Sequence, residues 1–258
     1  MGRILTPQHR QIYLWRHRTL CMGPSNSLAP RRYGAGALHV GVYAPFTIAV
    51  TGSAPRRARV AFVAPNTEHV VDFDGLVDAK LFIERDSIDY HTVAQSFPLS
   101  TVRLAVSEGE EWVQCMQGLY ESMASRDEAQ AALDERLRAV DRQAPALDHR
   151  IRGVLALIRR EPARNFRQEE LAAHAGISAS RLLAVFGQQM QMPYRRYRTW
   201  HRLLVAQRAL HRCDTLTHAA LEAGFSDSAH FSHSFRNAYG VTPAKVFRRP
   251  ERFEVESP

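Results

Sequence analysis

The sequence predicts an α+β multidomain fold: a β-rich N-terminal domain, a helical linker, and an all-α C-terminal domain with two helix-turn-helix motifs. Short apolar runs without a helical period fill the first hundred residues, two amphipathic stripes follow, and the pattern is helical from Asp148 onwards. A chain of 258 residues is long enough for two modest domains that each bury a core. We expect an N-terminal domain over residues 1–100, a linker over 101–145 and a C-terminal domain over 149–250.

The first hundred residues predict strands joined by turns. Their apolar runs are bounded by proline, glycine, asparagine and aspartate, which favour turns over helices. The clearest runs cover residues 12–15, 38–43, 46–50, 60–63 and 79–83. An antiparallel sandwich or barrel accounts best for such a series of short strands.

Cysteine usage and hydropathy indicate a reducing compartment and no membrane contact. The three cysteines are far apart and form no C-x-x-C pair, which argues against a disulfide framework or a zinc knuckle. The segment 33–55 has no charged residue, but its glycines and prolines favour short strands over a membrane-spanning helix. The first fifteen residues lack the apolar core of a signal peptide. We therefore expect a cytoplasmic protein.

Two amphipathic stripes predict a pair of helices after the β-rich part. The stripes consist of Trp112, Met116, Leu119 and Met123, and of Leu133, Leu137 and Val140. Between them, Ser125 and Glu128 have the spacing of a capping box, which starts a helix. The stripes either pack on their own domain or form a linker with a dimer seam, although they are too short for a long coiled coil. A homodimer is one expected assembly.

The excess positive charge lies entirely in the C-terminal part of the chain. Residues 149–258 hold 18 lysines and arginines against 9 acidic residues, whereas residues 1–148 hold 16 against 17. A domain with this balance attracts polyanions by electrostatic steering and counterion release. A basic surface that is merely solvated is the alternative that charge alone leaves open.

Residues 168–189 predict the first helix-turn-helix motif. Gly176 supplies the positive φ of a tight turn, Ile177 fills the corner and Ser178 can cap the following helix. The apolar anchors of the two helices are Leu171, Ala172, Ala175, Leu182, Val185 and Phe186. With these anchors buried, the opposite face of the second helix is free to enter a DNA major groove.

Residues 216–239 repeat this arrangement as a second motif. Here Gly224 supplies the turn, Phe225 fills the corner, and Ser226 or Asp227 caps the second helix. The apolar residues of this motif are Ala220, Ala223, Phe231 and Phe235. The last two are spaced like Leu182 and Phe186 of the first motif.

A long helix over about 194–211 is expected to connect the motifs. It carries five arginines: Arg195, Arg196, Arg198, Arg202 and Arg208. A rigid helix of this kind can hold both recognition helices about one DNA turn apart, roughly 34 Å. One Ala-x-x-x-Gly-x-Ser match is weak evidence, but two matches joined by an arginine-rich helix in a basic domain are strong evidence.

The C-terminal part resembles the DNA-binding domain of the AraC/XylS family of bacterial transcriptional regulators. The second motif carries the family's most characteristic run, with AGFSDS over 223–228, Phe231-x-x-x-Phe235-Arg236, and GVTP over 240–243. In and after the first motif the residues at family positions are Ser178, Leu182, Phe186, Tyr197, Arg202 and Ala206. The resemblance covers about residues 149–250. It implies binding to double-stranded promoter DNA and contact with RNA polymerase.

The recognition helices supply the predicted DNA contacts. The predicted DNA-binding residues are Ser178, Ser180, Arg181, Leu183, Ala184, Arg195, Ser228, Ala229, His230, Ser232, His233 and Arg236. The chain departs from the family at Gly187, where a basic residue is usual, and at Gln191, where glycine is usual. Serine, leucine and alanine cannot make bidentate bonds to a base edge. We therefore expect the first motif to serve docking and shape readout, with Arg181, Arg236 and the connecting-helix arginines on phosphates.

The N-terminal part resembles, more loosely, the cupin-like effector domains of longer family members. That resemblance implies a small-molecule effector. The segment APNTEH over 64–69 is similar to the turn that precedes a pocket histidine in those domains, and Arg31 and Arg32 stand near positions that flank the ligand. The expected effector-contacting residues are Arg31, His39 and His69.

A metal-dependent cupin enzyme is a weaker alternative. Such an enzyme needs a His-x-His pair followed by Glu, and no His-x-His occurs in the chain. We expect no catalytic residue, no metal site and no cofactor.

The chain is therefore predicted to be a sequence-specific transcription factor, and the sequence leaves activation and repression equally open. The rival classes are a nonspecific nucleoid or RNA-binding protein and a small cupin enzyme with a helical appendage.

Overall fold

The chain folds into two compact units. The computed structural model describes residues 9–25, 28–100, 103–138, 147–213, 215–247 and 250–256. One unit is formed by residues 1–144 together with 244–258, and the other, which is helical, by residues 145–243. The helical unit is thus inserted in the chain of the first unit and joined to it at both ends. The boundary expected at residue 100 falls inside the first unit.

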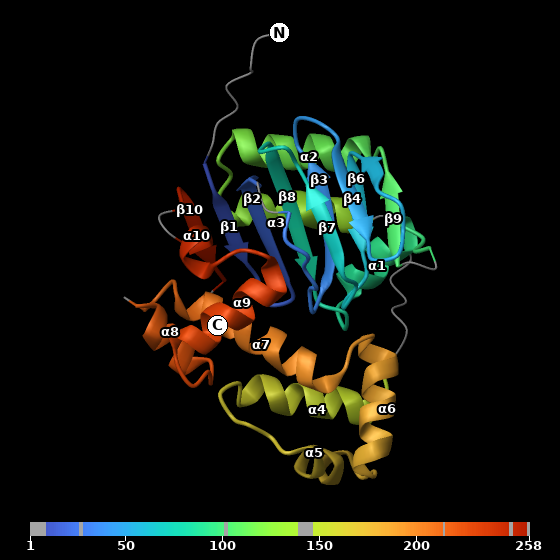
Figure 1. The fold of residues 1–258 in the computed structure, drawn as a ribbon, viewed down its shortest axis with the longest axis vertical. Coiled ribbons are helices and arrows are strands. Elements are labelled where there is room, and N and C mark those ends of the chain that lie inside the picture. The colour runs from blue at the N-terminus through green and yellow to red at the C-terminus, as the bar shows by residue number, and fades with distance from the viewer. Residues whose placement is uncertain are drawn as a thin grey trace. The chain divides into compact units, whose positions relative to one another are not determined.

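The first unit is built on two sheets (Figure 1). Its strands are β1 (Gln11–Leu14), β2 (Arg18–Pro24), β3 (Gly36–Gly41), β4 (Phe46–Val50), β5 (Arg56–Ala58), β6 (Val60–Val63), β7 (His69–Asp72), β8 (Val77–Ile83), β9 (Leu104–Ser107) and β10 (Arg252–Val255). The larger sheet has the order β10-β1-β2-β8-β3-β6-β9, and the smaller has the order β5-β4-β7. The β-rich N-terminal fold predicted from the turn-bounded apolar runs is confirmed.

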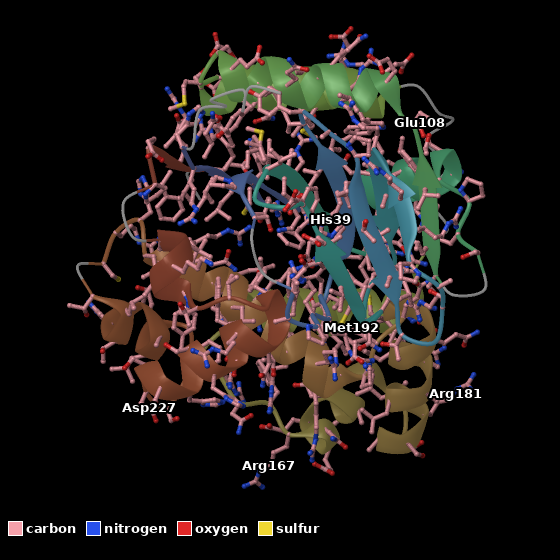
Figure 2. All side chains as sticks on the ribbon, turned by 45° about the horizontal axis from the view of Figure 1, so that its top comes forward. His39, Glu108, Arg167, Arg181, Met192 and Asp227 are labelled. Carbon is pink, nitrogen blue, oxygen red and sulfur yellow. The ribbon has the colours of Figure 1, made fainter. Side chains whose placement is uncertain are left out.

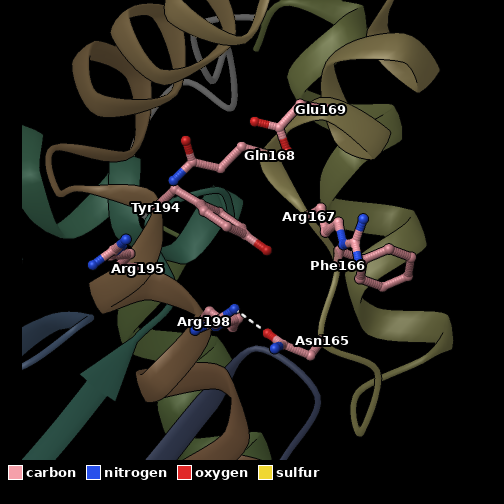
Figure 3. A pocket seen from close by; sticks show the side chains of 8 residues that line it. All are labelled: Asn165, Phe166, Arg167, Gln168, Glu169, Tyr194, Arg195 and Arg198. Carbon is pink, nitrogen blue, oxygen red and sulfur yellow. Dashed lines mark hydrogen bonds between the residues drawn. The ribbon is translucent and has the colours of Figure 1, made fainter.

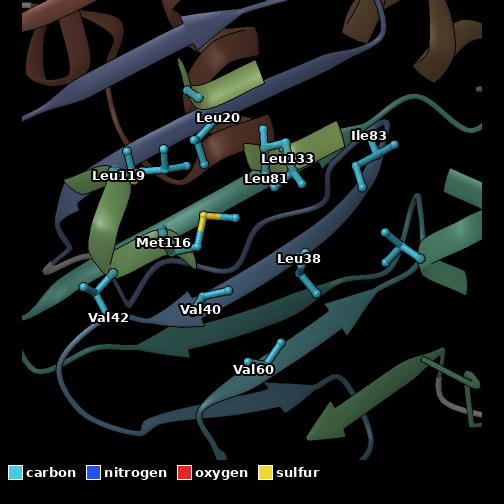
Figure 4. Packing of buried hydrophobic residues seen from close by; sticks show 14 of the residues in the cluster. Leu20, Leu38, Val40, Val42, Val60, Leu81, Ile83, Met116, Leu119 and Leu133 are labelled. Carbon is cyan, nitrogen blue, oxygen red and sulfur yellow. The ribbon is translucent and has the colours of Figure 1, made fainter. Parts of the chain in front are cut away.

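Three helices cover one face of the larger sheet: α1 (Ile88–Ser96), α2 (Glu110–Glu121) and α3 (Arg126–Leu137). Figure 4 shows Leu38, Val40 and Leu81 of the sheet facing side chains of these helices, among them Met116 and Leu133. Alternate residues of a strand face opposite sides, so these apolar positions define the helix-covered face. The amphipathic stripes of α2 and α3 therefore pack on their own unit. Val140 lies outside the described residues.

The two helix starts in this layer show why one helix was predicted and the other was missed. Ser125 and Glu128 form the expected capping box at α3. In α1, the Ser87 hydroxyl accepts a hydrogen bond from the Tyr90 amide at 3.2 Å. Only strands were predicted here, because α1 is nine residues long and its buried apolar residues are too few to establish a period.

The opposite face of the larger sheet packs against the smaller sheet. A second apolar cluster includes Phe46 and Ile48 of β4, Val63 of β6, and Val71 and Phe73 near β7. The side chains of β8 that alternate with its helix-facing residues point to this same side. The interior between the sheets thus contains both an apolar cluster and the polar groups of β3 and β8 described below.

The chain returns to the larger sheet after the helical unit. β10 adds as a parallel strand to β1, with Gln11 opposite Arg252 and Leu14 opposite Val255. Two carboxylates reinforce this edge, because Glu251 and Glu256 each accept a backbone N–H, from Arg10 and Arg16, at 2.6 Å. The sequence contains no turn or alternation strong enough to predict this four-residue strand.

The helical unit contains two helix-turn-helix motifs joined by one long helix. Its helices are α4 (His149–Arg160), α5 (Gln168–Ala175), α6 (Ala179–Met190), α7 (Tyr194–Ala209), α8 (Leu216–Glu222) and α9 (Ser228–Tyr239), followed by α10 (Pro243–Phe247), which leads back to the first unit. None of the helices in the described ranges combines the length and apolar character needed to cross a bilayer.

Helix α7 packs against both helix-turn-helix motifs. Its Tyr194 and Tyr197 contact Phe186 of α6, with ring centroids 5.7 Å and 5.4 Å apart. Further along α7, Trp200 contacts Tyr239 of α9 at 5.3 Å. The Gln207 amide is buried and donates a 2.8 Å hydrogen bond to the Tyr239 hydroxyl. Both recognition helices are therefore anchored on one rigid element.

The two turn glycines have the same backbone conformation but different surroundings. Gly176 has φ +64° and Gly224 has φ +81°, which an L side chain adopts only with strain. A Cβ at Gly176 would meet nothing within 4 Å, whereas a Cβ at Gly224 would lie 2.6 Å from the carbonyl oxygen of Ala163. Gly224 therefore permits a close backbone approach as well as a turn.

This difference predicts unequal costs for the same substitution. Gly176→Ala should lower the free energy of unfolding of the helical unit by about 1 kcal/mol through backbone strain. Gly224→Ala should lower it by about 1–3 kcal/mol more, because the added methyl overlaps the Ala163 carbonyl. Denaturant titration followed by circular dichroism measures both variants. Equal losses would show that the approach to Ala163 does not constrain the fold.

Candidate nucleic-acid interface and effector site

The first motif is formed by α5 and α6. Ser178 caps α6, since its hydroxyl accepts the Arg181 amide at 3.3 Å. Leu182, Val185 and Phe186 are buried, as expected. On the other side of α6, Ser180, Arg181 and Ala184 are exposed, and Leu183 is half-buried against the core. Figure 2 shows Arg181 projecting from the surface of this unit. The exposed face offers one cation and otherwise small groups.

Gln191 ends this helix in a conformation that glycine adopts more readily. Its φ is +57° at the C-cap of α6. The chain thus has a left-handed cap at the position where the resemblance to AraC/XylS regulators implies glycine, although glutamine takes this conformation at a cost of about 1–2 kcal/mol.

The second motif is formed by α8 and α9, with a turn one residue longer. The cap is Asp227, which accepts the His230 amide at 2.7 Å, so the cap follows the turn glycine by three positions instead of two. Bonds from the His230 amide and the Ser226 hydroxyl lower the pKa of Asp227. Phe231 and Phe235 are buried.

Because of the longer turn, residues of α6 and α9 are matched by their caps and buried anchors and not by their distance from the turn glycine. Aligning the caps and anchors places Ala229, His233 and Arg236 of α9 opposite Ser180, Ala184 and Gly187 of α6. The first three form one exposed face. Ser228 and Ser232 are half-buried beside that face. The reading face of α9 thus carries a cation and an imidazole where α6 carries alanine and glycine.

The two predicted histidines of α9 are held by local hydrogen bonds. The Ser226 hydroxyl and His230 Nδ1 are 3.1 Å apart, which ties His230 to the start of the helix. Asn237 Nδ2 lies 2.9 Å from His233 Nε2 on the next turn. His233 is exposed and oriented by this bond, so it is the better placed of the two for a base edge.

The arginines of α7 do not all face solvent. Arg195 and Arg196 are exposed and Arg198 is half-buried. Arg202 is buried, and its guanidinium donates to the Ala163 carbonyl at 3.4 Å. The expectation that every arginine of this helix holds a phosphate is therefore wrong for Arg202, which braces the loop next to Gly224.

In the first unit, the three predicted effector-contacting residues lie together. Arg31 and His69 pair as an isolated β-bridge, and the rings of His39 and His69 are 5.7 Å apart. All three residues are less than 3 % exposed. Figure 2 places His39 among the strands. The structure thus brings these side chains into one buried cluster between the two sheets.

Two further members of this cluster, Asp78 and Lys80 of β8, were not predicted from the sequence. Lys80 is opposite His39 across the β3–β8 ladder, and its ammonium lies 2.8 Å from Asp78. Burial works to lower the pKa of Lys80, but Asp78 holds it above its ordinary value. The signal was available, because Asp78 and Lys80 alternate with apolar residues in VDAKLFI and must share the face of Phe82.

Both imidazoles hold one ring nitrogen without a partner. His69 Nδ1 lies 2.8 Å from the Thr67 carbonyl, which can only accept, so Nδ1 carries the proton. His39 Nδ1 lies 3.5 Å from a carboxylate oxygen of Asp78, which also accepts, so Nδ1 carries the proton in this ring too. Among the described residues, Nε2 of neither ring has a hydrogen-bond partner. Each Nε2 is therefore a buried acceptor available to a donor group. No cluster of three or more metal-ligating side chains is found in the described ranges.

The helical unit matches a family model described as a helix-turn-helix domain over residues 171–249. Nearly the whole chain is similar in fold to ToxT from Vibrio cholerae. With an apo variant of ToxT from strain SCE256 the TM-score is 0.63 at 8% identity, covering 90% of this chain and 97% of that one. With ToxT from O395 bound to (E)-4-(8-methylnaphthalen-1-yl)but-3-enoic acid, the TM-score is 0.59 at 9% identity, covering 89% and 98%. A search of curated protein sequences gives no match.

The chain therefore contains a helix-turn-helix domain in its helical unit and shares its two-domain fold with ToxT. The match of the helical unit agrees with the resemblance of its motifs to the DNA-binding domains of the AraC/XylS family.

The buried histidines predict a pH-dependent stability. Burial lowers the pKa of both His39 and His69, so the unfolded chain binds more protons than the folded one below about pH 6.5. Stability is full above that pH and falls as the pH drops through it, by up to about 1.4 kcal/mol per pH unit for each histidine. Thermal unfolding between pH 7.5 and 5 measures this.

His69→Asn is the matched variant, since its amide can still donate to Thr67 while it no longer titrates. It should flatten the pH dependence of the melting temperature, and His174→Asn, an exposed change in the helical unit, should not. An unchanged slope in His69→Asn would rule out the neutral buried imidazole as its cause.

Proposed function

We propose that this protein binds promoter DNA sequence-specifically and regulates transcription in the bacterial cytoplasm in response to a small molecule. The observation that carries the proposal is the division of each recognition helix into a buried anchor face and an exposed face, both within the basic part of the chain. Phosphate contacts of arginines position such helices, and the exposed face reads bases or shape.

The second motif supplies most of the base recognition in this proposal. His233 can donate to or accept from a base edge, whereas Ser180 and Ala184 cannot form a bidentate contact. Arg236 and Arg181, exposed on the two recognition helices, hold phosphates. The first motif contributes docking and shape readout.

We further propose that the effector carries a carboxylate and occupies the cluster between the sheets. Arg31, which is buried, and Lys80, which is half-buried and paired with Asp78, supply positive charge there. The free Nε2 atoms of His39 and His69 accept from hydroxyl or amine donors. ToxT, which shares the fold, has been solved with an unsaturated fatty acid and with a butenoic acid derivative. Effector binding would act on the helical unit through the two chain connections that join the units.

The resemblance to AraC/XylS regulators implies further partners. We propose contact with RNA polymerase, in activation or in repression. We also propose a homodimer whose contact surface lies outside the apolar stripes of α2 and α3, because those stripes are buried within the first unit.

A footprint of the purified full-length protein on genomic DNA tests the function. Discrete protected sites upstream of genes are expected, and the adjacent genes would indicate the regulon. Protection without preferred sites would instead favour the nonspecific nucleic-acid binder, which the basic charge also permits.

Two variants separate phosphate contact from base contact at a site found in this way. Arg236→Ala should weaken binding to all sequences and reduce the slope of log K against log salt by about 0.9. His233→Ala should instead change preference at one base pair, by about 1–3 kcal/mol. Arg160→Ala, which removes the same charge from α4, is the control and should do neither. A single-base change in Arg236→Ala without general loss would contradict its assignment.

A further inference from the structure

A polar pocket opens between the start of α5 and the start of α7 in the helical unit. Its volume is about 470 Å³, and it is lined by Asn165, Phe166, Arg167, Gln168, Glu169, Tyr194, Arg195 and Arg198 (Figure 3). Three arginines against one glutamate give the lining a formal charge of +2. Arg198 is fixed there by a hydrogen bond to Asn165 and lies near the Tyr194 ring. The pocket is therefore built to receive an anion.

The start of α5 leaves backbone donors for such an anion. A helix N-terminus has N–H groups without partners in the helix, which a serine, threonine, aspartate or asparagine cap normally satisfies. Here the cap position is Arg167, whose guanidinium can only donate. Glu170 accepts the Arg167 amide at 2.7 Å, but that bond leaves the amides of the first turn unmet. These amides and the helix dipole favour a negative group.

The hydroxyl of Tyr194 gives independent evidence of a missing partner. Tyr194 is 4 % exposed, and its hydroxyl makes no hydrogen bond of ordinary geometry among the described residues, although the nearby Arg198 guanidinium acts to lower its pKa against the effect of burial. In Figure 3 this hydroxyl points into the pocket, towards Asn165 and Arg167. Leaving a buried hydroxyl unpaired is unfavourable, and an anion in the pocket would accept its proton.

We propose that this pocket binds one backbone phosphate of the DNA and so anchors the first helix-turn-helix motif. Arg195 and Arg198 supply the charge, while Tyr194 and the first-turn amides of α5 supply directed hydrogen bonds. The first helix of such a motif crosses the DNA backbone, which brings its N-terminus to a phosphate. This motif needs such an anchor, since α6 presents no bidentate base contact. The inference rests on the DNA binding proposed above and locates one of its contacts.

Tyr194→Phe tests the pocket with little risk to the fold. Removing an unpaired buried hydroxyl should leave the melting temperature of the free protein unchanged or raise it. The same change should weaken binding of the full-length protein to a 30-base-pair duplex by about threefold to tenfold, because the phosphate loses a donor. A structural role for the hydroxyl would give the opposite pattern, with lower stability and unchanged affinity.

Arg198→Ala and Arg196→Ala form a matched pair on α7. Arg198→Ala should weaken duplex binding about tenfold and reduce the salt slope by about 0.9. Arg196 is two residues away, exposed and outside the pocket lining, so its loss should have a clearly smaller effect. Equal effects of the two changes would overturn the proposal, since charge without a pocket would explain them.

Inorganic phosphate distinguishes a DNA phosphate from a small phosphate ligand. Melting temperatures are compared in phosphate and in chloride at equal ionic strength, with and without the Arg198→Ala change. If phosphate stabilises the native protein through Arg198 while duplex affinity is unaffected by that change, the pocket serves a small ligand and the proposal is wrong. If the native protein binds no duplex at all, the proposed function fails and not only the pocket.

Discussion

The aromatic contacts along α7 are the constraint on which the helical unit depends. Phe186 of the first recognition helix packs on Tyr194 and Tyr197, and Tyr239 of the second packs on Trp200. Because one sixteen-residue helix carries both sets of contacts, neither recognition helix can turn independently of the other. Because these contacts fix the buried face of each recognition helix, they also determine which face is exposed. The Gln207–Tyr239 hydrogen bond and the close approach of Gly224 to Ala163 secure the second motif in the same way.

The two motifs are alike in backbone and unlike in surface. Both turn glycines have positive φ, and both second helices begin at a side-chain cap. One motif then presents serine, alanine and glycine, and the other presents alanine, histidine and arginine. A motif whose exposed face carries one arginine and otherwise small groups needs further contacts for affinity, and the proposed phosphate pocket at α5 would add one. The proposed assignment of docking to the first motif and base recognition to the second rests on this difference.

Much of this organisation could be predicted from the sequence, because it depends on local patterns. The capping box at Ser125, the cap at Ser178 and the turn glycines each need only a few neighbouring residues. What could not be predicted depends on contacts distant in the chain. Nothing near residue 252 indicates that β10 pairs with β1, and the pocket at α5 joins a loop to a helix some thirty residues further on. The prediction that Arg202 holds a phosphate was wrong for the same reason, because the loop at Ala163 buries its side chain.

The effector cluster could be predicted from the sequence only in part. His39 and His69 were predicted singly, from a resemblance and a position, while Asp78 and Lys80 required the register of β3 against β8. Polar residues in the interior of a sandwich are costly unless they are paired. Here Lys80 and Asp78 pair with each other, and the imidazoles keep free acceptors. The polar interior is thus consistent with a binding role, and the apolar cluster around Phe46 supplies the packing.

Selection of bound sequences from a pool of random duplexes tests the central claim most directly, that α7 fixes two recognition helices as one DNA-binding unit. The account predicts an enriched site with two short elements at one fixed spacing of about one helical turn, roughly 10 base pairs. The element read by α9 should be the better defined of the two. Enrichment of a single element, or of two elements at variable spacing, would contradict it.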